Sequence, residues 1–487
     1  MKITKLFITV LILFLVFGAC TNSNQNSKKN IASEKQTPNI IYILADDLGY
    51  GDLSCYGQTN FSTPNIDKLA ESGMKFTQHY SGCTVCAPSR SALLTGQHTG
   101  HTFIRGNKEI QPEGQHPLEA KAVTMAEVLQ KAGYVTGAFG KWGLGYPGSE
   151  GDPNNQGFDE FFGFNCQRMG HNYYPYHLWH NQEKIVLKGN EGKQTGEYGP
   201  DVIHNRAIKF LEDNKDKPFF MYYPSIIPHA ELLAPEKYMD KYRGKFLPEL
   251  KYIGVDDGEN YRLGPYGSQP ESHATFAAMV NILDDEVGEI VAKLKELGIY
   301  ENTLIIFTSD NGPHMEGGAD PDYFDSNGIL KGYKRDLYEG GIRIPMIAVW
   351  DGKIKPGTET DHISAFWDVF PTVAEITGIE TLENIDGISF LPTLLGQEQK
   401  PHDYLYWEFH ERGGRKALRK GDCKLVNYNV LKPELTTIEL YNLIDDPGEE
   451  NNVAHAHPKI VAELIELMKS ARTESEIFLF ESPTIIK

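Results

Sequence analysis

The sequence predicts an α/β fold in which helices cover a large, mixed and mostly parallel sheet, followed by a small C-terminal domain with an antiparallel sheet and a helix. Short apolar, β-branched segments that indicate buried strands alternate with segments of helical periodicity along most of the chain. Near residue 400 this order gives way to consecutive short strands. With 487 residues, the chain is long enough for a large core and more than one domain.

The alternating elements can be assigned from their patterns. Buried strands are expected at residues 39–45, 134–140, 218–223, 303–308 and 344–350. Helices are expected at residues 62–72, 123–132, 205–214 and 274–297. The first of these helices has the clearest start, because Ser62 and Thr63 are polar capping residues and Pro64 suits the first turn.

The C-terminal part has a different pattern. Residues 404–430 contain short strand-like segments separated by glycine-containing turns. A further strand is expected at 439–443, and an amphipathic helix at 458–471. We therefore predict a main domain at residues 38–398 and a C-terminal α+β domain at residues 399–487.

The N-terminal residues 1–20 indicate an export signal. A positively charged start precedes an apolar segment at 6–17, which is too short to span a membrane comfortably. Small residues then lead to Cys20, which resembles the lipid-modified cysteine of a bacterial lipoprotein; cleavage and release of the protein is the alternative. Residues 21–37 are polar and indicate a flexible tether. We therefore expect an exported protein of the periplasm or outer membrane that contacts the membrane only through a lipid anchor.

Charge and cysteine content argue against several classes of function. The net charge is −19, from 66 acidic and 47 basic residues. Nucleic acid is therefore not an expected partner, because phosphate binding needs a basic surface. Cys83 and Cys86 have the spacing of a redox or zinc pair, but no second pair of ligands at similar spacing accompanies them. The few cysteines in so long a chain also argue against a disulfide framework.

Polar side chains follow several predicted strands at their carboxyl ends. These residues are Asp46 and Asp47, Lys141, His229, and Asp310 and Asn311. Because ligands of open α/β sheets bind beyond the carboxyl ends of the strands, we expect these side chains to meet at one edge of the sheet. Three carboxylates and one amide suit a hard cation such as Ca²⁺ or Mg²⁺, whose charge would relieve the repulsion among the carboxylates.

The segment from Cys86 to Gly96, Cys-Ala-Pro-Ser-Arg-Ser-Ala-Leu-Leu-Thr-Gly, is the most informative in the chain. It resembles the signature of type I sulfatases, C-x-P-S-R-x-x-L-x-T-G, at every specified position. Other parts of the chain are similar to motifs of the same family, namely residues 46–47, 63–67, 310–312 and 440–447, and Lys334, which stands five residues before the glutamate of Glu-Gly-Gly. The resemblance covers residues 38–475 and implies the alkaline-phosphatase-like fold and a sulfuric ester hydrolase.

The resemblance also implies roles for individual residues. A formylglycine-generating maturation enzyme would oxidise Cys86 to formylglycine, whose hydrated aldehyde attacks sulfur and then expels the sulfate. The implied metal ligands, for Ca²⁺ or alternatively Mg²⁺, are Asp46, Asp47, Cys86, Asp310 and Asn311. The implied partners of the sulfate ester are Arg90, Lys141 and Lys334, which neutralise its oxygens, and His229, which protonates the leaving alcohol. A helix from Ser89 onward would favour negative charge at Cys86.

One position departs from the family pattern. The family carries Gly-Lys-Trp-His-Leu-Gly where this chain has Gly140-Lys-Trp-Gly-Leu-Gly145. The histidine that contacts the formylglycine in relatives is therefore Gly143 in this chain. A base for the release of sulfate would have to come from elsewhere, and His101 and His171 are the candidates.

The substrate is expected to be a sulfated sugar. Residues 166–180 are dense in aromatic residues and histidines, which predicts either a packed loop or a platform on which a sugar ring stacks. The candidate substrate-binding residues are His101, His171, His314 and Glu316. The segments around Lys141, His229 and Asp310 resemble those of carbohydrate sulfatases, which implies a galactose or N-acetylgalactosamine sulfate.

Two other functions remain open at this point. A phosphonate monoester or phosphodiester hydrolase of the same superfamily would share the fold and the metal site. A non-catalytic, lipid-anchored glycan-binding protein would also keep the fold. The intact Cys86 motif and the complete set of metal positions argue against the second alternative, and only Gly143 favours it.

Overall fold

The computed structural model describes residues 37–380 and 382–480. The segments predicted as signal peptide and tether, up to residue 36, and the predicted lipid attachment at Cys20 lie outside the described residues. Within the described ranges, no helix has both the length and the apolar character that a membrane span requires.

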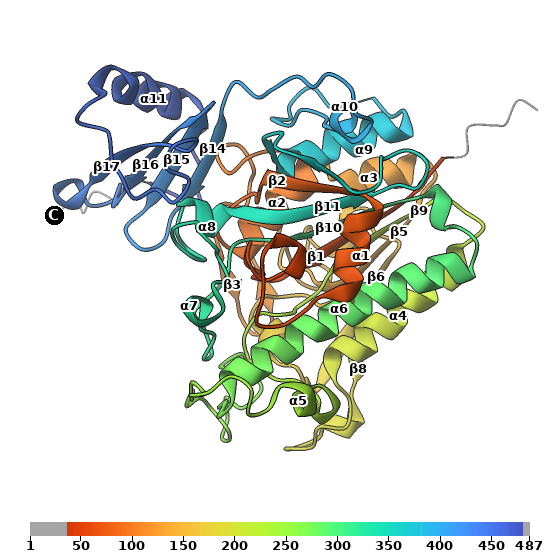
Figure 1. Ribbon diagram of the computed structural model, residues 1–487. Coiled ribbons are helices and arrows are strands. Elements are labelled where there is room, and N and C mark those ends of the chain that lie inside the picture. The colour runs from red at the N-terminus through yellow and green to blue at the C-terminus, as the bar shows by residue number, and fades with distance from the viewer. Residues whose placement is uncertain (1–36, 381, 481–487) are drawn as a thin grey trace, which may run out of the picture. The chain divides into compact units, whose positions relative to one another are not determined.

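A large mixed sheet forms the centre of the main part of the chain (Figure 1). Its strands, in spatial order, are β12 (Thr358–Thr360), β2 (Met74–Tyr80), β11 (Arg343–Val349), β10 (Thr303–Ser309), β1 (Asn39–Ala45), β9 (Phe219–Pro224), β5 (Val135–Lys141), β6 (Glu160–Phe164), β7 (His177–His180) and β8 (Glu183–Val186), with β13 (Ser364–Ala365) beside β2. The run from β10 to β6 is parallel, whereas β11, β7 and β8 pair antiparallel to their neighbours. The predicted mostly parallel sheet is confirmed.

Helices cover both faces of this sheet (Figure 1). Strand β1 illustrates why, since Ile41 and Ile43 belong to the core on one face while Ile40 and Tyr42 belong to the core on the other. One face is covered by α1 (Pro64–Ser72), α4 (Gly199–Asn214), α5 (Glu236–Tyr242) and α6 (Ser272–Glu296). The other is covered by α2 (Cys86–Thr95), α3 (Met125–Lys131) and α9 (Val369–Thr377).

The differences from the sequence-based assignment have physical reasons. All five expected strands and four expected helices are present, with bounds shifted by a few residues at most ends, although α4 begins earlier, at Gly199. Strands β2 and β6 were not predicted; β2 (Met-Lys-Phe-Thr-Gln-His-Tyr) is half-polar along its middle, and β6 has only five residues. Helix α2 begins at Cys86 itself, so the expected start at Ser89 is wrong; Pro88 is tolerated within its first turn.

The C-terminal residues form the predicted antiparallel sheet with one helix. Its strands are β14 (Leu405–Phe409), β15 (Arg415–Lys420), β16 (Cys423–Tyr428) and β17 (Thr437–Asn442). Leu464 and Met468 of α11 (Pro458–Ser470) pack on one face of this sheet. On the other face, the Trp407 ring lies 5.3 Å from Tyr80 and 5.7 Å from Trp367, measured between ring centroids. The sheet is thus joined to the main part by a continuous apolar contact.

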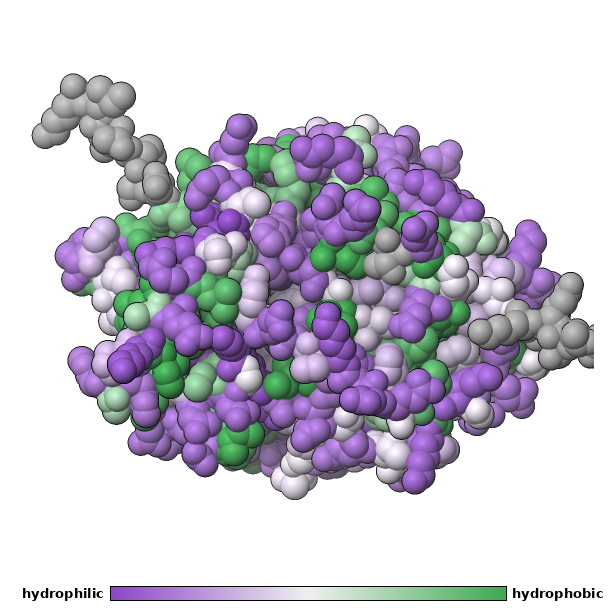
Figure 2. Space-filling view, turned by 90° about the horizontal axis from the view of Figure 1, so that it is seen from above, coloured by the Kyte–Doolittle hydropathy of each residue, from purple (hydrophilic) through white to green (hydrophobic). Residues whose placement is uncertain are grey.

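The surface is predominantly hydrophilic on the face that Figure 2 shows, with hydrophobic residues in small separate groups. Individual exposed apolar side chains such as Ile253 are normal for a protein surface. This pattern agrees with the strongly negative net charge of −19.

A buried ion network lies between the main part and the C-terminal sheet. Lys424 Nζ on β16 lies 2.9 Å from Glu339 Oε1 and 3.0 Å from Glu449 Oε1, and all three side chains are fully buried. Tyr80 Oη donates a 2.6 Å hydrogen bond to the other oxygen of Glu339. Lys424 therefore serves two buried carboxylates at once, and Arg343 adds a second cation 3.5 Å from Glu339 Oε2.

Removal of the Lys424 ammonium group should lower the denaturant concentration at which the protein unfolds. Lys424→Met keeps the length of the side chain but leaves Glu339 and Glu449 without their shared partner, so we expect a loss of about 3–5 kcal/mol in the free energy of unfolding. Urea titration, monitored by circular dichroism, measures this loss in the free energy of unfolding. The matched control is Lys420→Met on the neighbouring strand, whose exposed pair with Glu463 should contribute little. Equal midpoints for the two variants would contradict the prediction.

Candidate active site

Two strands carry the acidic residues to one edge of the sheet. Strands β1 and β10 are parallel neighbours, with Ala45 opposite Ser309 at their carboxyl ends. Asp46 and Asp47 therefore emerge beside Asp310 and Asn311, as the sequence predicted. The backbone N–H of Asp47 donates to Asp310 Oδ1 at 3.1 Å, and Asn311 Nδ2 donates to Asp47 Oδ1 at 2.7 Å.

Cys86 begins helix α2 and faces this edge. Its Sγ atom lies 3.2 Å from Asp46 Oδ1 and 3.5 Å from Lys141 Nζ. Burial, followed by the charges of Asp310 and Asp46, raises the pKa of the Cys86 thiol well above its usual value. The unmodified side chain is therefore a neutral thiol and a weak nucleophile, because the thiolate is the reactive form.

Arg90 holds the acidic edge to helix α2. Its guanidinium donates to Asp310 Oδ2 from Nε at 3.1 Å and from Nη2 at 2.9 Å, and Nη1 donates to the carbonyl of Lys141. The side chain is fully buried. The hydrogen bonds of this guanidinium group join the ends of β10 and β5 to the helix that begins at Cys86.

Lys334 and His229 complete the charge balance on the other side. Lys334 Nζ donates to Asp47 Oδ2 at 2.7 Å and lies 2.9 Å from His229 Nε2. Burial alone would raise the pKa of Asp47, but Lys334, His314 and Lys141 together lower it to about 2. Burial, then Lys334, lowers the pKa of His229 well below its usual value. Because the Nδ1 atom of His229 is 2.5 Å from the carbonyl of Ala230, a neutral imidazole donates there and accepts from Lys334 at Nε2.

Three histidines are stacked at this wall. The ring centroids of His171 and His229 are 4.8 Å apart, and those of His229 and His314 are 5.4 Å apart, with nearly parallel planes. Burial lowers the pKa of His171 to about 3 and that of His314 to about 4. The stack is therefore uncharged near neutral pH, and the positive charge in contact with it is the ammonium of Lys334, which lies 2.9 Å from His229 Nε2.

The acidic edge has the donors that a hard cation prefers. The ligand atoms of Asp46, Asp47, Cys86 and His229 lie within 4.8 Å of one another, and Asp310 and Asn311 adjoin them. Burial, then Asp46, raises the pKa of Asp310 to about 6. The Oδ1 atom of Asn311 is buried and accepts no hydrogen bond from any described residue. Carboxylates that crowd together beside an unused amide oxygen fit Ca²⁺ or Mg²⁺.

A cavity of about 630 Å³ opens onto Cys86. It is lined by Cys86, Asn107, Glu109, Gln115, Gln167, Arg168, His171, His229, Asn260, Gly264, Pro265, Tyr266, Lys334 and Arg335. Of these, the sequence identified only Cys86, His171, His229 and Lys334. Gln167 and Arg168 lie in the segment 166–180, which its composition had already indicated. Residues of the loop 260–266 also line the cavity, but the sequence could not predict this, because that loop has no recognisable motif.

The aromatic residues of the 166–180 segment face elsewhere. Tyr173 and Tyr174 belong to the hydrophobic core, and neither Tyr176 nor Trp179 lines the cavity of Cys86. The stacking platform proposed for them is therefore not formed, and the packed-loop alternative describes them. Tyr266, from another loop, is the aromatic side chain among the residues that line the cavity of Cys86.

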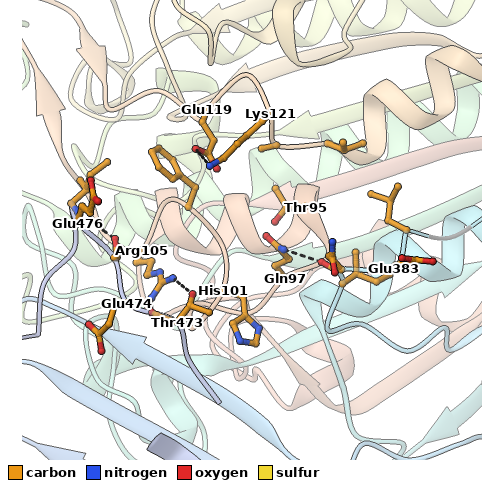
Figure 3. Close-up of a pocket in the computed structure, with 18 residues that line it drawn as sticks. Thr95, Gln97, His101, Arg105, Glu119, Lys121, Glu383, Thr473, Glu474 and Glu476 are labelled. Carbon is orange, nitrogen blue, oxygen red and sulfur yellow. Dashed lines mark hydrogen bonds and ion pairs between the residues drawn. The ribbon is translucent and has the colours of Figure 1, made fainter. Parts of the chain in front are cut away.

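His101 does not reach this cavity, which overturns its assignment as a substrate-binding residue or a base. Its Nδ1 atom lies 2.8 Å from Asp386 Oδ1, and it lines a separate cavity of about 860 Å³ (Figure 3). Several charged groups of that cavity already have a partner: Lys121 pairs with Glu119 at 3.1 Å, and Arg105 pairs with Glu408 at 3.1 Å. The cavity is larger than that of Cys86 but holds no comparable reactive group among the described residues.

His314 and Glu316 lie behind the cavity rather than along its wall. His314 Nε2 lies 3.2 Å from the carbonyl of Pro228. Glu316 Oε2 lies 3.3 Å from Lys334 Nζ, and Glu316 also pairs with Arg335. Both residues therefore contact residues that line the cavity and do not line it themselves.

Comparisons with known proteins agree with this geometry. A sequence model of the family described as Sulfatase matches residues 38–379, and one described as N-sulphoglucosamine sulphohydrolase, C-terminal, matches residues 331–474. The chain is 32% identical to an N-acetylgalactosamine-6-O-sulfatase of Bacteroides thetaiotaomicron, over 93% of this chain and 96% of the relative. It is 32% identical to arylsulfatase A of Homo sapiens, over 88% of this chain and 87% of the relative. The crystal structure of Ps i-CgsB in complex with k-i-k-neocarrahexaose is similar, with a TM-score of 0.73 and 29% identity over 89% of this chain and 92% of that chain.

Asp52 stabilises the loop that follows Asp47. Its Oδ2 atom accepts a 2.7 Å hydrogen bond from the backbone N–H of Gly49, and the side chain is fully buried. Burial raises the pKa of Asp52 to about 7. Since this pKa lies above that of an unfolded aspartate, its contribution to stability is complete below about pH 4 and is lost as the pH rises through about 7.

Asp52→Asn should remove this pH dependence. The amide oxygen can still accept from Gly49, but no carboxyl has to ionise in the core. Relative to the parent protein, the variant should gain on the order of 3 kcal/mol in free energy of unfolding between pH 4 and pH 8. Urea titrations of both proteins at several pH values measure the difference. A difference that does not change with pH would show that Asp52 is not the titrating group.

Proposed function

Because this chain belongs to the sulfatase family, whose members hydrolyse sulfate esters, we propose that it acts on sulfated carbohydrates bound in the cavity that Cys86 lines. The observation that carries the proposal is the position of Cys86. Its Sγ atom lies between a carboxylate of the acidic edge and the ammonium of Lys141, at the wall of the cavity. A group formed there is next to both a cation site and a positive charge.

Conversion of Cys86 to formylglycine by a maturation enzyme is the second part of the proposal. A neutral thiol in this environment is a weak nucleophile, and the raised pKa of Cys86 supports the need for conversion. A hydrated aldehyde would offer one hydroxyl to attack sulfur and a second to expel the sulfate. The match of residues 86–96 to the family signature supports the same conclusion.

A divalent cation is the third part. Asp46, Asp47, Asp310 and Asn311 would hold Ca²⁺ or Mg²⁺, and the unpaired Oδ1 atom of Asn311 supports this set. When bound, the cation would polarise the sulfate ester and stabilise the negative charge of the nucleophile.

The chain supplies the remaining charges and protons. Lys141, 3.5 Å from Cys86 Sγ, and Lys334 would neutralise sulfate oxygens, and Arg90 would hold Asp310 in position. The proton for the leaving alcohol would come from the ammonium of Lys334, whose Nζ is 2.9 Å from His229 Nε2, and would pass to the alcohol through Nε2, which leaves Lys334 as the neutral amine. His229 then serves as the acid only together with Lys334, because its neutral ring holds its own proton at Nδ1.

The lining of the cavity supports a sugar as the carrier of the sulfate. Amide side chains of Asn107, Gln115, Gln167 and Asn260 suit hydroxyl groups, and the aromatic face of Tyr266 suits the C–H groups of a ring. A relative of this chain is named for N-acetylgalactosamine, and a similar structure contains a neocarrahexaose. We propose galactose or N-acetylgalactosamine sulfate as the substrate.

The residue pattern at positions 1–20 supports a proposal about the cellular context. We propose that residues 1–20 direct export, that Cys20 carries a lipid, and that the protein works in the periplasm or at the outer membrane. The division at residue 398 into a main and a C-terminal domain is part of the same proposal.

Mass spectrometry of the peptide containing Cys86 tests the proposed nucleophile. Protein co-expressed with a formylglycine-generating enzyme should show a loss of about 18 Da at Cys86, the difference between thiol and aldehyde. The converted protein should hydrolyse an aryl sulfate, and Cys86→Ala protein from the same host should not. An unmodified Cys86 under conditions that convert a known sulfatase would refute this nucleophile.

Removal of metal tests the cation site and the nearest alternative function. Chelation should abolish hydrolysis of the aryl sulfate, and added Ca²⁺ or Mg²⁺ should restore it. Asn311→Ala should need a higher cation concentration for half-maximal rate, by about 10-fold or more. Rates on an aryl phosphonate monoester and a phosphodiester under the same conditions should be lower than on the sulfate. A reversed order would favour the phosphonate or phosphodiester hydrolase.

A further inference from the structure

Gln167 occupies the space that a side chain at position 143 would need. Gly143 has a φ of +80°, and a Cβ atom built on it would lie 1.9 Å from Gln167 Nε2. The backbone explains this approach, because Trp142 N–H donates to the carbonyl of Phe164 and Gly143 N–H to that of Asn165, each at 2.9 Å. These bonds continue the pairing of β5 with β6 and bring residue 167 beside residue 143.

The carboxamide of Gln167 has no partner of its own. The residue is 8% exposed, and neither Nε2 nor Oε1 makes a hydrogen bond to any residue that the structure describes. Buried amides are normally paired, since an unpaired donor and acceptor cost free energy. Gln167 lines the cavity of Cys86, so a bound molecule with an acceptor oxygen can supply the missing partner of Nε2.

The position of Gln167 indicates which part of a bound molecule it meets. Gly143 follows Lys141 by two residues, and Lys141 Nζ is 3.5 Å from Cys86 Sγ. The loop that carries Gln167 also packs on the Lys141 side chain, because a Cβ on Gly170 would lie 2.8 Å from Lys141 Cδ. Gln167 thus belongs to the Lys141 side of the cavity, where the sulfate group would be held.

We propose that Gln167 is a substrate-binding residue whose N–H donates to an oxygen of the sulfate ester at Cys86, in the space that the absence of a side chain at Gly143 leaves free. This inference rests on the proposed function. A carboxamide donates and accepts hydrogen bonds but does not titrate, so Gln167 binds the anion and cannot remove a proton. Gln167 therefore fills the space of the histidine that relatives carry at position 143, but it cannot serve as the base that this histidine would be.

Variants that keep the shape of Gln167 separate binding from packing. Gln167→Met fills the same volume without hydrogen bonds and should lower kcat/KM about 10- to 100-fold, chiefly through a higher KM. The matched control is Asn165→Leu, because the side chain of Asn165 is also buried and unpaired but does not line the cavity. That control should change thermal stability without changing KM. A KM of Gln167→Met equal to that of the parent enzyme would overturn the proposal.

Gln167→Glu tests the role of Gln167 through the pH dependence of kcat/KM, which would not change if the side chain served only for packing. Only the protonated carboxyl can donate to the sulfate, so its kcat/KM should fall as the pH rises, more steeply than that of the parent enzyme. A pH profile parallel to that of the parent enzyme would mean that no proton of residue 167 is donated to substrate.

The spatial exchange with position 143 can be tested directly. Gly143→His alone should have a lower kcat/KM than the parent enzyme, because the new side chain collides with Gln167. Gly143→His combined with Gln167→Gly should recover kcat/KM by at least about 10-fold over the single variant, since the collision is removed and histidine tolerates a positive φ better than most residues. A double variant no better than Gly143→His would contradict the shared space.

Binding without turnover distinguishes failure of this inference from failure of the proposed function. Inorganic sulfate, the product of every sulfate ester, is titrated into Cys86→Ser protein with and without Gln167→Met, and heat is measured. The Kd should rise about 10-fold or more in the second protein. Equal Kd values would overturn the role of Gln167 whether or not the converted enzyme is active. Loss of all activity with this Kd shift intact would count against the proposed function alone.

Discussion

The balance of buried opposite charges at one edge of the sheet is the constraint on which the rest of the molecule depends. Asp46, Asp47 and Asp310 are fully buried, and each meets a cation from a distant segment: Lys141, Lys334 and Arg90. An unpaired charge in such surroundings would be strongly destabilising. The ends of β1, β5 and β10, the start of α2 and the loop of Lys334 are therefore held in one arrangement.

This balance also sets the chemistry that the edge can support. The carboxylates crowd their oxygens beside Asn311, and of the three cations that pair with them only Lys334 lines the cavity. The three stacked histidines add no charge near neutral pH, because burial lowers their pKa values. An anionic group entering the cavity thus meets the ammonium of Lys334, the guanidinium groups of Arg168 and Arg335 and the unpaired amide of Gln167, beside an edge suited to a divalent cation.

Patterns in the sequence predicted the central fold well, for a reason that individual strands make plain. Strands such as Asn39–Ala45 and Thr303–Ser309 are apolar on both faces, as only strands covered on both sides can be. The half-polar β2 and the short β6 carry weaker patterns and were missed. His101 was misplaced for a different reason: its position depends on Asp386, a residue 285 positions away in the chain.

The sequence by itself determined the family, the order of the elements and the residues of the acidic edge, since these follow from local pattern and from a contiguous motif. The tertiary structure alone decided which loops line the cavity, the protonation of His229 and the pairing of Gly143 with Gln167. Each of these depends on contacts between segments far apart in sequence, or on burial that no local pattern records. A glycine in the chain shows only that a side chain is missing; the carboxamide that fills its place is visible only when β5 and β6 lie side by side.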